Sequence, residues 1–180
     1  KKLSKLVKPH IGVITNIGEA HLENFKNVKE IAKAKSEIIE NIKPGGTIIL
    51  NRDDKFFNFL FKKAKSHNLK ICTFGRHYKS DVRIIKIINK VNSLKLLVNC
   101  NKQIINLEIK DLNIHNVLAS ITILKELKID LSKISLKFKN LSSPEGRGKK
   151  HSISRYRKKF NLIDESYNAN PLSVKNAIKK

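Results

Sequence analysis

Apolar and polar positions follow two alternating patterns in the first half of the chain. Short, almost continuous apolar runs are separated by longer segments in which apolar residues recur every three or four positions. The first pattern indicates buried strands and the second indicates helices. We expect strands at residues 10–17, 47–51 and 70–75, and helices at residues 28–42 and 53–68. This alternation predicts an α/β fold, with a mostly parallel sheet flanked by helices.

The pattern changes after residue 81, where three strand-like runs follow one another with turns near residues 90–93 and 99–102. Leu94, Leu96 and Val98 fall on one face of the middle run. Alternation of this kind is typical of antiparallel strands with one face toward solvent. We therefore expect an antiparallel β insertion in the otherwise parallel sheet.

The last third of the chain contains a change of domain. Helical patterns return at residues 113–127 and 131–141, and a charged segment containing proline and glycine follows at residues 142–150. Such a composition is typical of a linker or loop. A strand at residues 159–164 and a helix after Pro171 come next. The expected domains are residues 1–144 and residues 145–180, the second of which we expect to be incomplete.

The first of the expected helices contains an unusual lysine. It begins with a capping pattern, Asn27 followed by Glu30. At helical spacing Lys35 falls inside the apolar arc and Lys33 falls on the opposite face; the arc consists of Ile31, Ala34, Ile38, Ile39 and Ile42. Shelter from water disfavours the charged form of an amine, and a neutral amine can add carbon dioxide to become a carbamate. Beside the imidazole of His21, a carbamate offers oxygen ligands to a divalent cation.

Composition excludes several classes of protein. The chain has 180 residues, of which 40% are hydrophobic, enough for one domain and part of another. It has no apolar run of about 20 residues and no secretory signal at its start. We therefore expect a cytoplasmic protein without membrane insertion, in which Cys72 and Cys100 are free thiols.

The formal net charge of +23 raises the alternative of a basic nucleic-acid-binding domain. Lysine supplies most of this charge and is spread along the whole chain, and aromatic residues make up only 6%. Base-stacking surfaces combine basic and aromatic residues in one stripe, and no such stripe is evident. We expect no specific nucleic-acid partner, although this alternative stays open.

Two separated motifs resemble the signatures of the Mur ligase family. They are "TNIGEAHLENF" with "AKAKSEI" downstream, and "PEGRG" with "LIDESYNANP" downstream. The "AHLE" and "SYNANP" forms resemble the branch that joins D-alanyl-D-alanine to a UDP-N-acetylmuramoyl-tripeptide. The resemblance implies an incomplete central ATP-binding domain and the start of a Rossmann-like C-terminal domain. Another ligase of the family or a folylpolyglutamate synthetase relative remains an alternative.

The resemblance also implies roles for individual residues. Lys35 matches the lysine that the family carbamylates, His21 matches a magnesium ligand, and Asn16 matches an asparagine near the substrate and phosphate. Arg147 matches the arginine that reaches the terminal phosphate of ATP. The residues that match the adenine and ribose contacts are Asn113, Asn116 and Glu165. The loop that would close over ATP and the dipeptide contains Ser166, Asn168 and Asn170.

The chemistry that the resemblance implies is amide formation driven by ATP and Mg²⁺. The peptide carboxylate attacks the γ-phosphate to give an acyl phosphate and ADP, and the dipeptide amine then displaces phosphate. The sequence contains no G-x-x-x-x-G-K-[ST] phosphate loop, so we expect an internal fragment that does not turn over alone. The full-length protein is expected to be a monomer.

Overall fold

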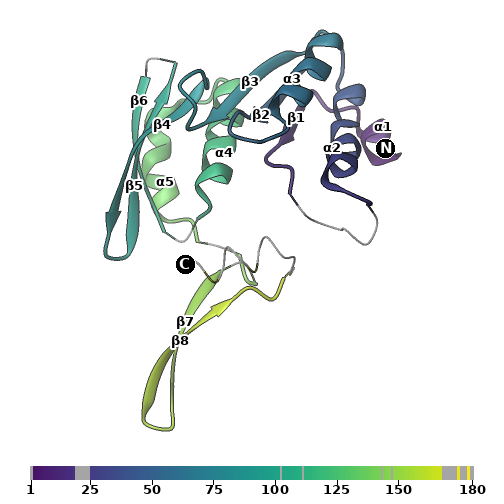
Figure 1. Ribbon diagram of the computed structural model, residues 1–180. Coiled ribbons are helices and arrows are strands. Elements are labelled where there is room, and N and C mark those ends of the chain that lie inside the picture. The colour runs from purple at the N-terminus through teal and green to yellow at the C-terminus, as the bar shows by residue number, and fades with distance from the viewer. Residues whose placement is uncertain are drawn as a thin grey trace.

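The computed structural model describes residues 2–18, 25–101, 103–110, 112–142, 144–146, 148–167, 174 and 178. Its main feature is a six-stranded sheet with the strand order β1-β2-β3-β4-β5-β6 (Figure 1). The strands are β1 (Ile11–Ile14), β2 (Thr47–Asn51), β3 (Lys70–Gly75), β4 (Val82–Lys90), β5 (Ser93–Cys100) and β6 (Gln103–Ile109). Among the described residues, no helix is long and apolar enough to cross a membrane.

Strands β1, β2 and β3 are parallel, as the alternating pattern predicted. The helices that follow β1 and β2 are α2 (Val28–Ser36), the short 3₁₀ helix η2 (Ile39–Asn41) and α3 (Phe57–Ser66), and a six-residue helix, α1 (Lys2–Val7), precedes β1. Every residue of β2 is buried. Ile48 and Leu50 pack toward the side of η2 and α3, whereas Ile49 packs into the core on the opposite face. The parallel part is therefore covered on both faces, which explains its continuous apolar strands.

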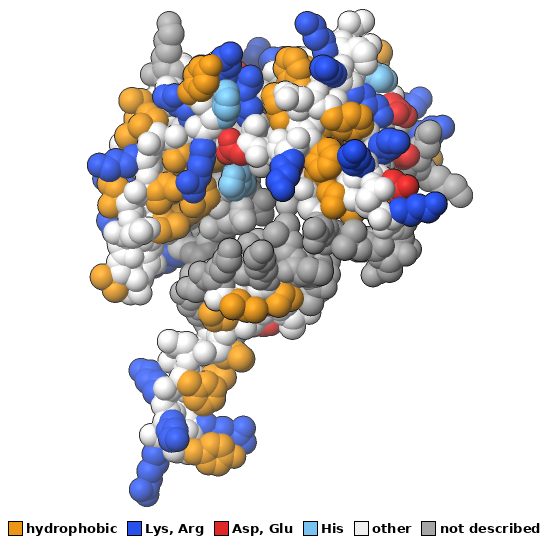
Figure 2. Space-filling model, in the orientation of Figure 1, with side chains coloured by type: hydrophobic (Ala, Val, Ile, Leu, Met, Phe, Trp, Pro, Cys, Tyr) orange, Lys and Arg blue, Asp and Glu red, His pale blue; other side chains and the backbone are white. Residues whose placement is uncertain are grey.

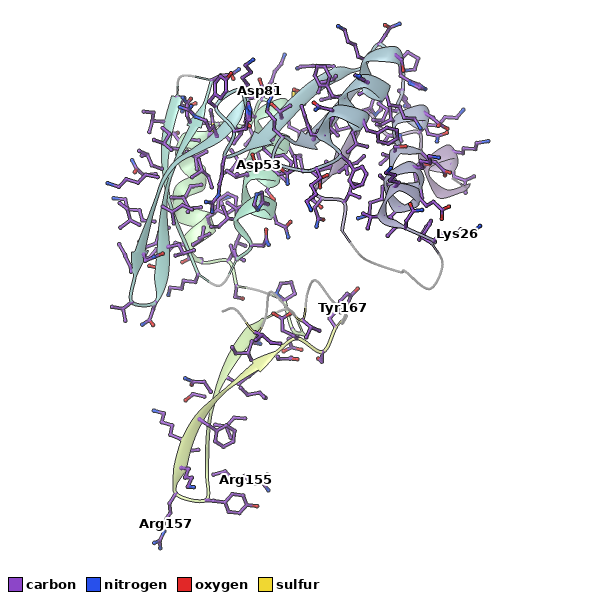
Figure 3. The ribbon with its side chains drawn as sticks, viewed as in Figure 1. Lys26, Asp53, Asp81, Arg155, Arg157 and Tyr167 are labelled. Atoms are coloured by element: carbon purple, nitrogen blue, oxygen red, sulfur yellow. The ribbon has the colours of Figure 1, made fainter. Side chains whose placement is uncertain are left out.

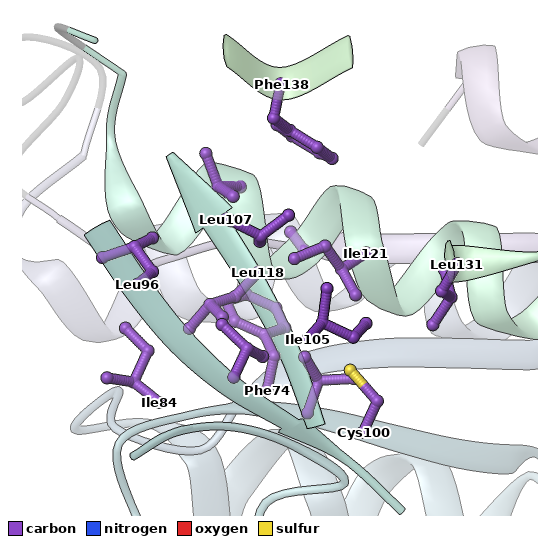
Figure 4. Close-up of a cluster of buried hydrophobic side chains, with 14 of the residues drawn as sticks. Phe74, Ile84, Leu96, Cys100, Ile105, Leu107, Leu118, Ile121, Leu131 and Phe138 are labelled. Carbon is purple, nitrogen blue, oxygen red and sulfur yellow. The ribbon is translucent and has the colours of Figure 1, made fainter. Parts of the chain in front are cut away.

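The antiparallel insertion is confirmed. Strand β5 pairs with β4 and β6 in antiparallel register. Helices α4 (Ile114–Glu126) and α5 (Ile134–Lys139), with the 3₁₀ helix η3 (Leu131–Lys133) between them, lie against one face. The core there includes Phe74, Leu96, Leu107, Leu118 and Phe138 (Figure 4). The other face is exposed at Ile85, Ile88 and Ile104, as expected for a sheet with one wet face.

The last described elements form a separate two-stranded antiparallel hairpin, β7 (Lys149–Arg155) and β8 (Lys158–Asp164). Strand β8 confirms the strand expected at residues 159–164. The linker expected to reach Lys150 is wrong at its end, because β7 begins at Lys149. Val174 and Ile178 are helical, and the rest of the helix expected after Pro171 lies outside the described residues. The domain boundary after residue 144 remains a prediction.

Glu126, in the last turn of α4, attaches this helix to the sheet. Its carboxylate accepts hydrogen bonds from Lys70 Nζ at 2.7 and 2.8 Å and from Thr47 Oγ1 at 2.7 Å. Burial raises the pKa of the carboxyl, but these hydrogen bonds outweigh it, so the pKa of Glu126 is lowered from its ordinary value. Burial and the nearby carboxylate raise the pKa of Cys72 to about 11, which keeps this thiol protonated.

Replacing Glu126 with glutamine is expected to lower the free energy of unfolding by about 1–3 kcal/mol at neutral pH, because charged hydrogen bonds are lost. A carboxyl with a lowered pKa in the folded state stabilises above its unfolded pKa near 4.5 and loses that contribution as pH falls through the folded pKa. The free energies of unfolding of the wild type and of Glu126→Gln should therefore differ most above pH 4.5 and become equal in acid. Urea denaturation followed by circular dichroism at several pH values measures this difference.

The control for this prediction is Glu145→Gln. Glu145 has an 85% exposed side chain, and its ion pair among the described residues is with Lys149, at 3.2 Å. An exposed ion pair contributes little to stability, so we expect no measurable change. An equal loss for Glu126→Gln at all pH values would contradict the assigned charge interaction.

Candidate functional site

The carboxyl ends of β1, β2 and β3 meet at one edge of the sheet, where ligands collect in open α/β folds. Polar side chains connect the segments that leave these strands. Asn51 Nδ2 donates to the carbonyl of Thr15 at 3.0 Å, and the N–H of Ile17 donates to Asp54 at 2.7 Å. Asp54 also accepts the N–H of Phe56 at 2.8 Å, near the start of α3. The edge is therefore a connected polar surface.

Lys35 reaches this edge from α2. Its Nζ donates to the carbonyl of Asn16, two residues after the end of β1, at 3.0 Å. The structure thus brings together two of the residues predicted for the site. His21, the third, lies outside the described residues.

The expectation that Lys35 is sheltered in the apolar face of α2 is wrong. Its side chain is exposed, like that of Lys33, and the buried residues of α2 are Ile31, Ala32 and Ser36. The predicted cap is correct, because the Asn27 side chain accepts the N–H of Glu30 at 3.1 Å. The helix, however, ends at Ser36 rather than Ile42. Burial therefore does not support a carbamate on Lys35. The observation that supports a role for Lys35 is its hydrogen bond to the Asn16 carbonyl at the end of β1.

Asp53 connects β2, the loop after β3 and the start of α4 (Figure 3). Its carboxylate accepts the N–H groups of Arg76 and His77 at 2.6 and 3.0 Å, and it lies 3.5 Å from His115 Nε2. Figure 2 shows histidine side chains on both sides of an acidic group on this face. The roles of Asp53 and His115 were not predicted from the sequence. The available signals were an aspartate two residues after a buried strand and a histidine next to Asn116.

Asn113 and Asn116 lie together at the start of α4. The side-chain oxygen of Asn113 caps the helix by accepting the N–H of Asn116 at 3.1 Å. His115, the residue before Asn116, contacts Asp53. The two asparagines predicted to contact adenine are therefore placed near the carboxyl edge of the sheet, although Asn113 uses its side-chain oxygen for the cap.

Asp164, at the end of β8, organises the junction that contains the other predicted residues. Its carboxylate accepts the N–H groups of Gly146 at 3.0 Å and Ser166 at 3.1 Å, and its carbonyl accepts the N–H of Gly148 at 2.7 Å. Hydrogen bonds from Ser166 and Gly146 lower the pKa of Asp164. Tyr167 closes the turn by donating its N–H to the Gly146 carbonyl at 3.1 Å (Figure 3).

This junction includes the residues on either side of Arg147, the predicted phosphate contact. Arg147 lies outside the described residues, but both of its neighbours, Gly146 and Gly148, are bonded to Asp164. Glu165 and Ser166 follow Asp164 directly, so the junction brings both sequence motifs of the C-terminal segment together. Asn168 and Asn170 lie outside the described residues.

The described residues do not by themselves form a magnesium site. No group of three or more His, Cys, Asp or Glu side chains in the described part of the chain could hold a metal ion. At the end of β1 the described groups include the Lys35 ammonium, which donates to the Asn16 carbonyl, and the Asp54 carboxylate, which accepts the N–H of Ile17. Magnesium prefers oxygen ligands, so a metal would fit here only with a carbamate on Lys35 and with His21.

Comparison with known proteins gives one family match. The profile of the Mur ligase middle domain matches residues 1–124. The UDP-N-acetylmuramoyl-tripeptide–D-alanyl-D-alanine ligase of Buchnera aphidicola from Acyrthosiphon pisum is 35% identical over 98% of the chain. The ligase of the same name from Rickettsia prowazekii is 31% identical over 98% of the chain.

Solved structures agree with this match. A crystal structure of MurF from Acinetobacter baumannii superposes with a TM-score of 0.82 at 30% identity, over 96% of this chain and 37% of that one. MurF from Thermotoga maritima in complex with ADP gives a TM-score of 0.79 at 22% identity, which shows likeness of fold. The chain spans 39% of the length of the Buchnera and Rickettsia relatives.

Proposed function

The chain belongs to the Mur ligase family, and from this membership we propose that it is the central part of an ATP-dependent ligase of peptidoglycan synthesis. The proposed reaction joins D-alanyl-D-alanine to UDP-N-acetylmuramoyl-tripeptide through an acyl phosphate. The observation that carries this choice is coverage: the relatives named for that reaction align over 98% of the chain. By contrast, the D-glutamate ligase of Clostridium acetobutylicum aligns over 72%.

The proposed roles at the β1 edge follow from the Lys35 contact. Lys35 would take up carbon dioxide at Nζ, forming a nitrogen–carbon bond and releasing a proton, and the resulting carboxylate with His21 would hold Mg²⁺. Bound Mg²⁺ would neutralise charge on the phosphates of ATP during phosphoryl transfer. Asn16, whose carbonyl contacts Lys35, would position the lysine and the reacting phosphate. Arg147 would bind the transferring phosphoryl group from the opposite, C-terminal side.

The nucleotide and dipeptide would lie between the two expected domains, residues 1–144 and 145–180. Asn113 and Asn116 would contact the adenine, and Glu165 would hold the ribose. Ser166, Asn168 and Asn170 would close over ATP and the dipeptide. The hydrogen bonds of Asp164 to Gly146 and Ser166 support this arrangement, because they fix the segment that leads into that loop. We further propose a cytoplasmic monomer.

The test uses a polypeptide of the relatives' length that contains this chain. With ATP, Mg²⁺, UDP-N-acetylmuramoyl-tripeptide and D-alanyl-D-alanine, we expect ADP and the ligated product in equal amounts. The 180-residue chain alone is the matched control and is expected not to turn over. Ligation of D-glutamate to UDP-N-acetylmuramoylalanine instead would assign the chain to another branch of the family.

A further inference from the structure

Asp53 joins three segments that are distant in the sequence (Figure 3). It lies two residues after β2, where its own N–H donates to the Asn51 side chain at 3.0 Å. Its Oδ1 accepts the N–H of His77 at 3.0 Å, and its Oδ2 accepts the N–H of Arg76 at 2.6 Å. The same Oδ2 lies 3.5 Å from Nε2 of His115, in the first turn of α4. One carboxylate thus connects β2, the loop after β3 and α4.

The Asp53 carboxylate has little freedom to move. Gly75 lies directly against it, since a Cβ built on this glycine would lie 2.7 Å from Oδ2. The Asn51 side chain that binds the Asp53 N–H is buried and also donates to the Thr15 carbonyl at 3.0 Å. The Asp53 side chain itself is 24% exposed. The carboxylate is therefore a fixed point at the carboxyl edge of the sheet.

The contact of Asp53 with His115 differs in kind from its two backbone hydrogen bonds. The N–H groups of Arg76 and His77 hold the turn after β3, and this turn needs no histidine on α4. His115 is the second residue of α4 and its side chain is 38% exposed, yet its ring lies beside the carboxylate. This contact ties the first turn of α4 to the carboxyl edge of the sheet, by charge when the imidazole is protonated.

That same turn carries the asparagine proposed to recognise the base. The Asn113 cap binds the backbone N–H of Asn116, not its side-chain amide. His115 directly precedes Asn116, so the place of the His115 ring fixes how the turn is rotated about the axis of α4. A side-chain amide forms a hydrogen bond only over a narrow range of distance and angle. A small rotation of the turn would therefore move the Asn116 amide out of reach of a base.

We infer that Asp53 is a positioning residue of the nucleotide site, which acts through His115 to set the preference of the proposed ligase for adenine over other purines. The inference rests on the proposed function, from which it takes the contact of Asn116 with the base. An asparagine amide can donate to N7 of adenine and accept from the exocyclic amino group beside it. Inosine triphosphate has a carbonyl oxygen in place of that amino group, which repels the amide oxygen if the amide is held in this orientation.

A role of Asp53 in folding alone predicts a different kinetic result. Loss of a purely structural contact reduces the amount of folded enzyme, and this lowers the rates with ATP and with inosine triphosphate by the same factor. Loss of a positioning contact changes the ratio of kcat/KM for the two nucleotides, because the site then binds adenine less selectively. The ratio therefore separates the two roles.

The test compares ATP with inosine triphosphate in a polypeptide of the relatives' length that contains this chain. Asp53→Asn keeps one acceptor oxygen for the backbone N–H groups, and His115→Gln leaves the Asp53 carboxylate in place. We expect each variant to lower the ratio of kcat/KM for ATP over inosine triphosphate by about three- to tenfold, mainly through a higher KM for ATP. The double variant should lose no more than either single variant, because both remove one contact.

Two other aspartates provide matched controls. Asp54, next to Asp53, binds the N–H of Ile17 at 2.7 Å on the β1 side, and Asp54→Ser removes this contact. Asp81 binds the N–H and Oγ1 of Thr73 at 2.8 and 2.6 Å, and Asp81→Asn weakens this contact within the sheet. We expect both controls to keep the wild-type ratio for the two nucleotides, whatever their effect on rate or on stability in urea.

Isothermal titration calorimetry with each nucleotide, without the peptide substrates, measures the base preference independently of ligation. A wild type that prefers ATP in this titration but forms no ligated product would contradict the proposed function, and the titration ratios would still decide the role of Asp53. An unchanged ratio in His115→Gln would overturn the inference even if Asp53→Asn is too unstable to purify. So would an unchanged ratio in folded Asp53→Asn, a wild type without preference for ATP, or an equal fall in Asp54→Ser or Asp81→Asn.

Discussion

Replacing Lys35 with alanine is expected to reduce ligase turnover at least about a hundredfold in a polypeptide of the relatives' length that contains this chain. The amine donates to the Asn16 carbonyl at the carboxyl end of β1. Alanine removes both this contact and the proposed carbamate, and with it the proposed oxygen ligand for magnesium. Steady-state measurement of the ligated product detects the loss.

Lys33→Ala is the matched control, because Lys33 is also exposed and lies on the same helix. We expect Lys33→Ala to keep nearly full activity. Bicarbonate or a short carboxylic acid such as acetate should partly restore Lys35→Ala, since a small carboxylate can occupy the space of the missing side chain. Unchanged turnover in Lys35→Ala would refute the metal-bridging role, and equal losses in both variants would indicate a general effect on the helix.

The strands of the parallel sheet could be predicted because burial on both faces leaves a direct mark on the sequence. Strands β2 and β3 coincide with the runs expected at residues 47–51 and 70–75. Strand β7 has no such mark: its sequence is KKHSISR, with one large apolar residue. Its pairing with β8 depends on a turn and on the hydrogen bonds of Asp164, which hydrophobic spacing does not report.

The wrong prediction that Lys35 is buried has a different cause. The sequence pattern predicts one helix over residues 28–42, but α2 ends at Ser36 and the 3₁₀ helix η2 follows. Ile39 and Ile42 belong to the core through this second element. At helical spacing, however, Lys35 still falls between Ile31 and Ala32 on the buried face of α2. It is exposed because its long side chain carries Nζ outward to the Asn16 carbonyl at the end of the sheet.

The group around Asp53 could not be found from spacing at all. Asp53 and His115 are far apart in the sequence, and they meet only because α4 packs against β2 and β3. The backbone N–H groups that Asp53 binds, in Arg76 and His77, have no side-chain signature. Sequence could indicate which strand ends carry polar groups, but the partners of each group depend on the packing of the elements.

Gly75, the last residue of β3, gives a second prediction with a large effect, this time on stability. Its φ is +150°, and a Cβ built there would lie 2.7 Å from Asp53 Oδ2. Asp53 cannot move away cheaply, because Arg76, His77 and His115 hold its carboxylate. We expect Gly75→Ala to lower the free energy of unfolding by about 3 kcal/mol, from backbone strain and lost charged hydrogen bonds. Urea denaturation measures the change.

Gly45→Ala separates strain from collision. Gly45 also has a positive φ, +73°, but nothing lies within 4 Å of a Cβ built there. Its substitution should therefore cost only about 1–2 kcal/mol of strain. In an Asp53→Ala background the collision at residue 75 is absent, so Gly75→Ala should there cost about as little as Gly45→Ala. If Gly75→Ala lowers the free energy of unfolding equally with and without Asp53, then the Asp53 carboxylate is not the reason that position 75 requires glycine. If Gly75→Ala costs less stability in the Asp53→Ala background, as expected, then the contacts of Asp53 with Arg76, His77 and His115 require a residue without a side chain at position 75.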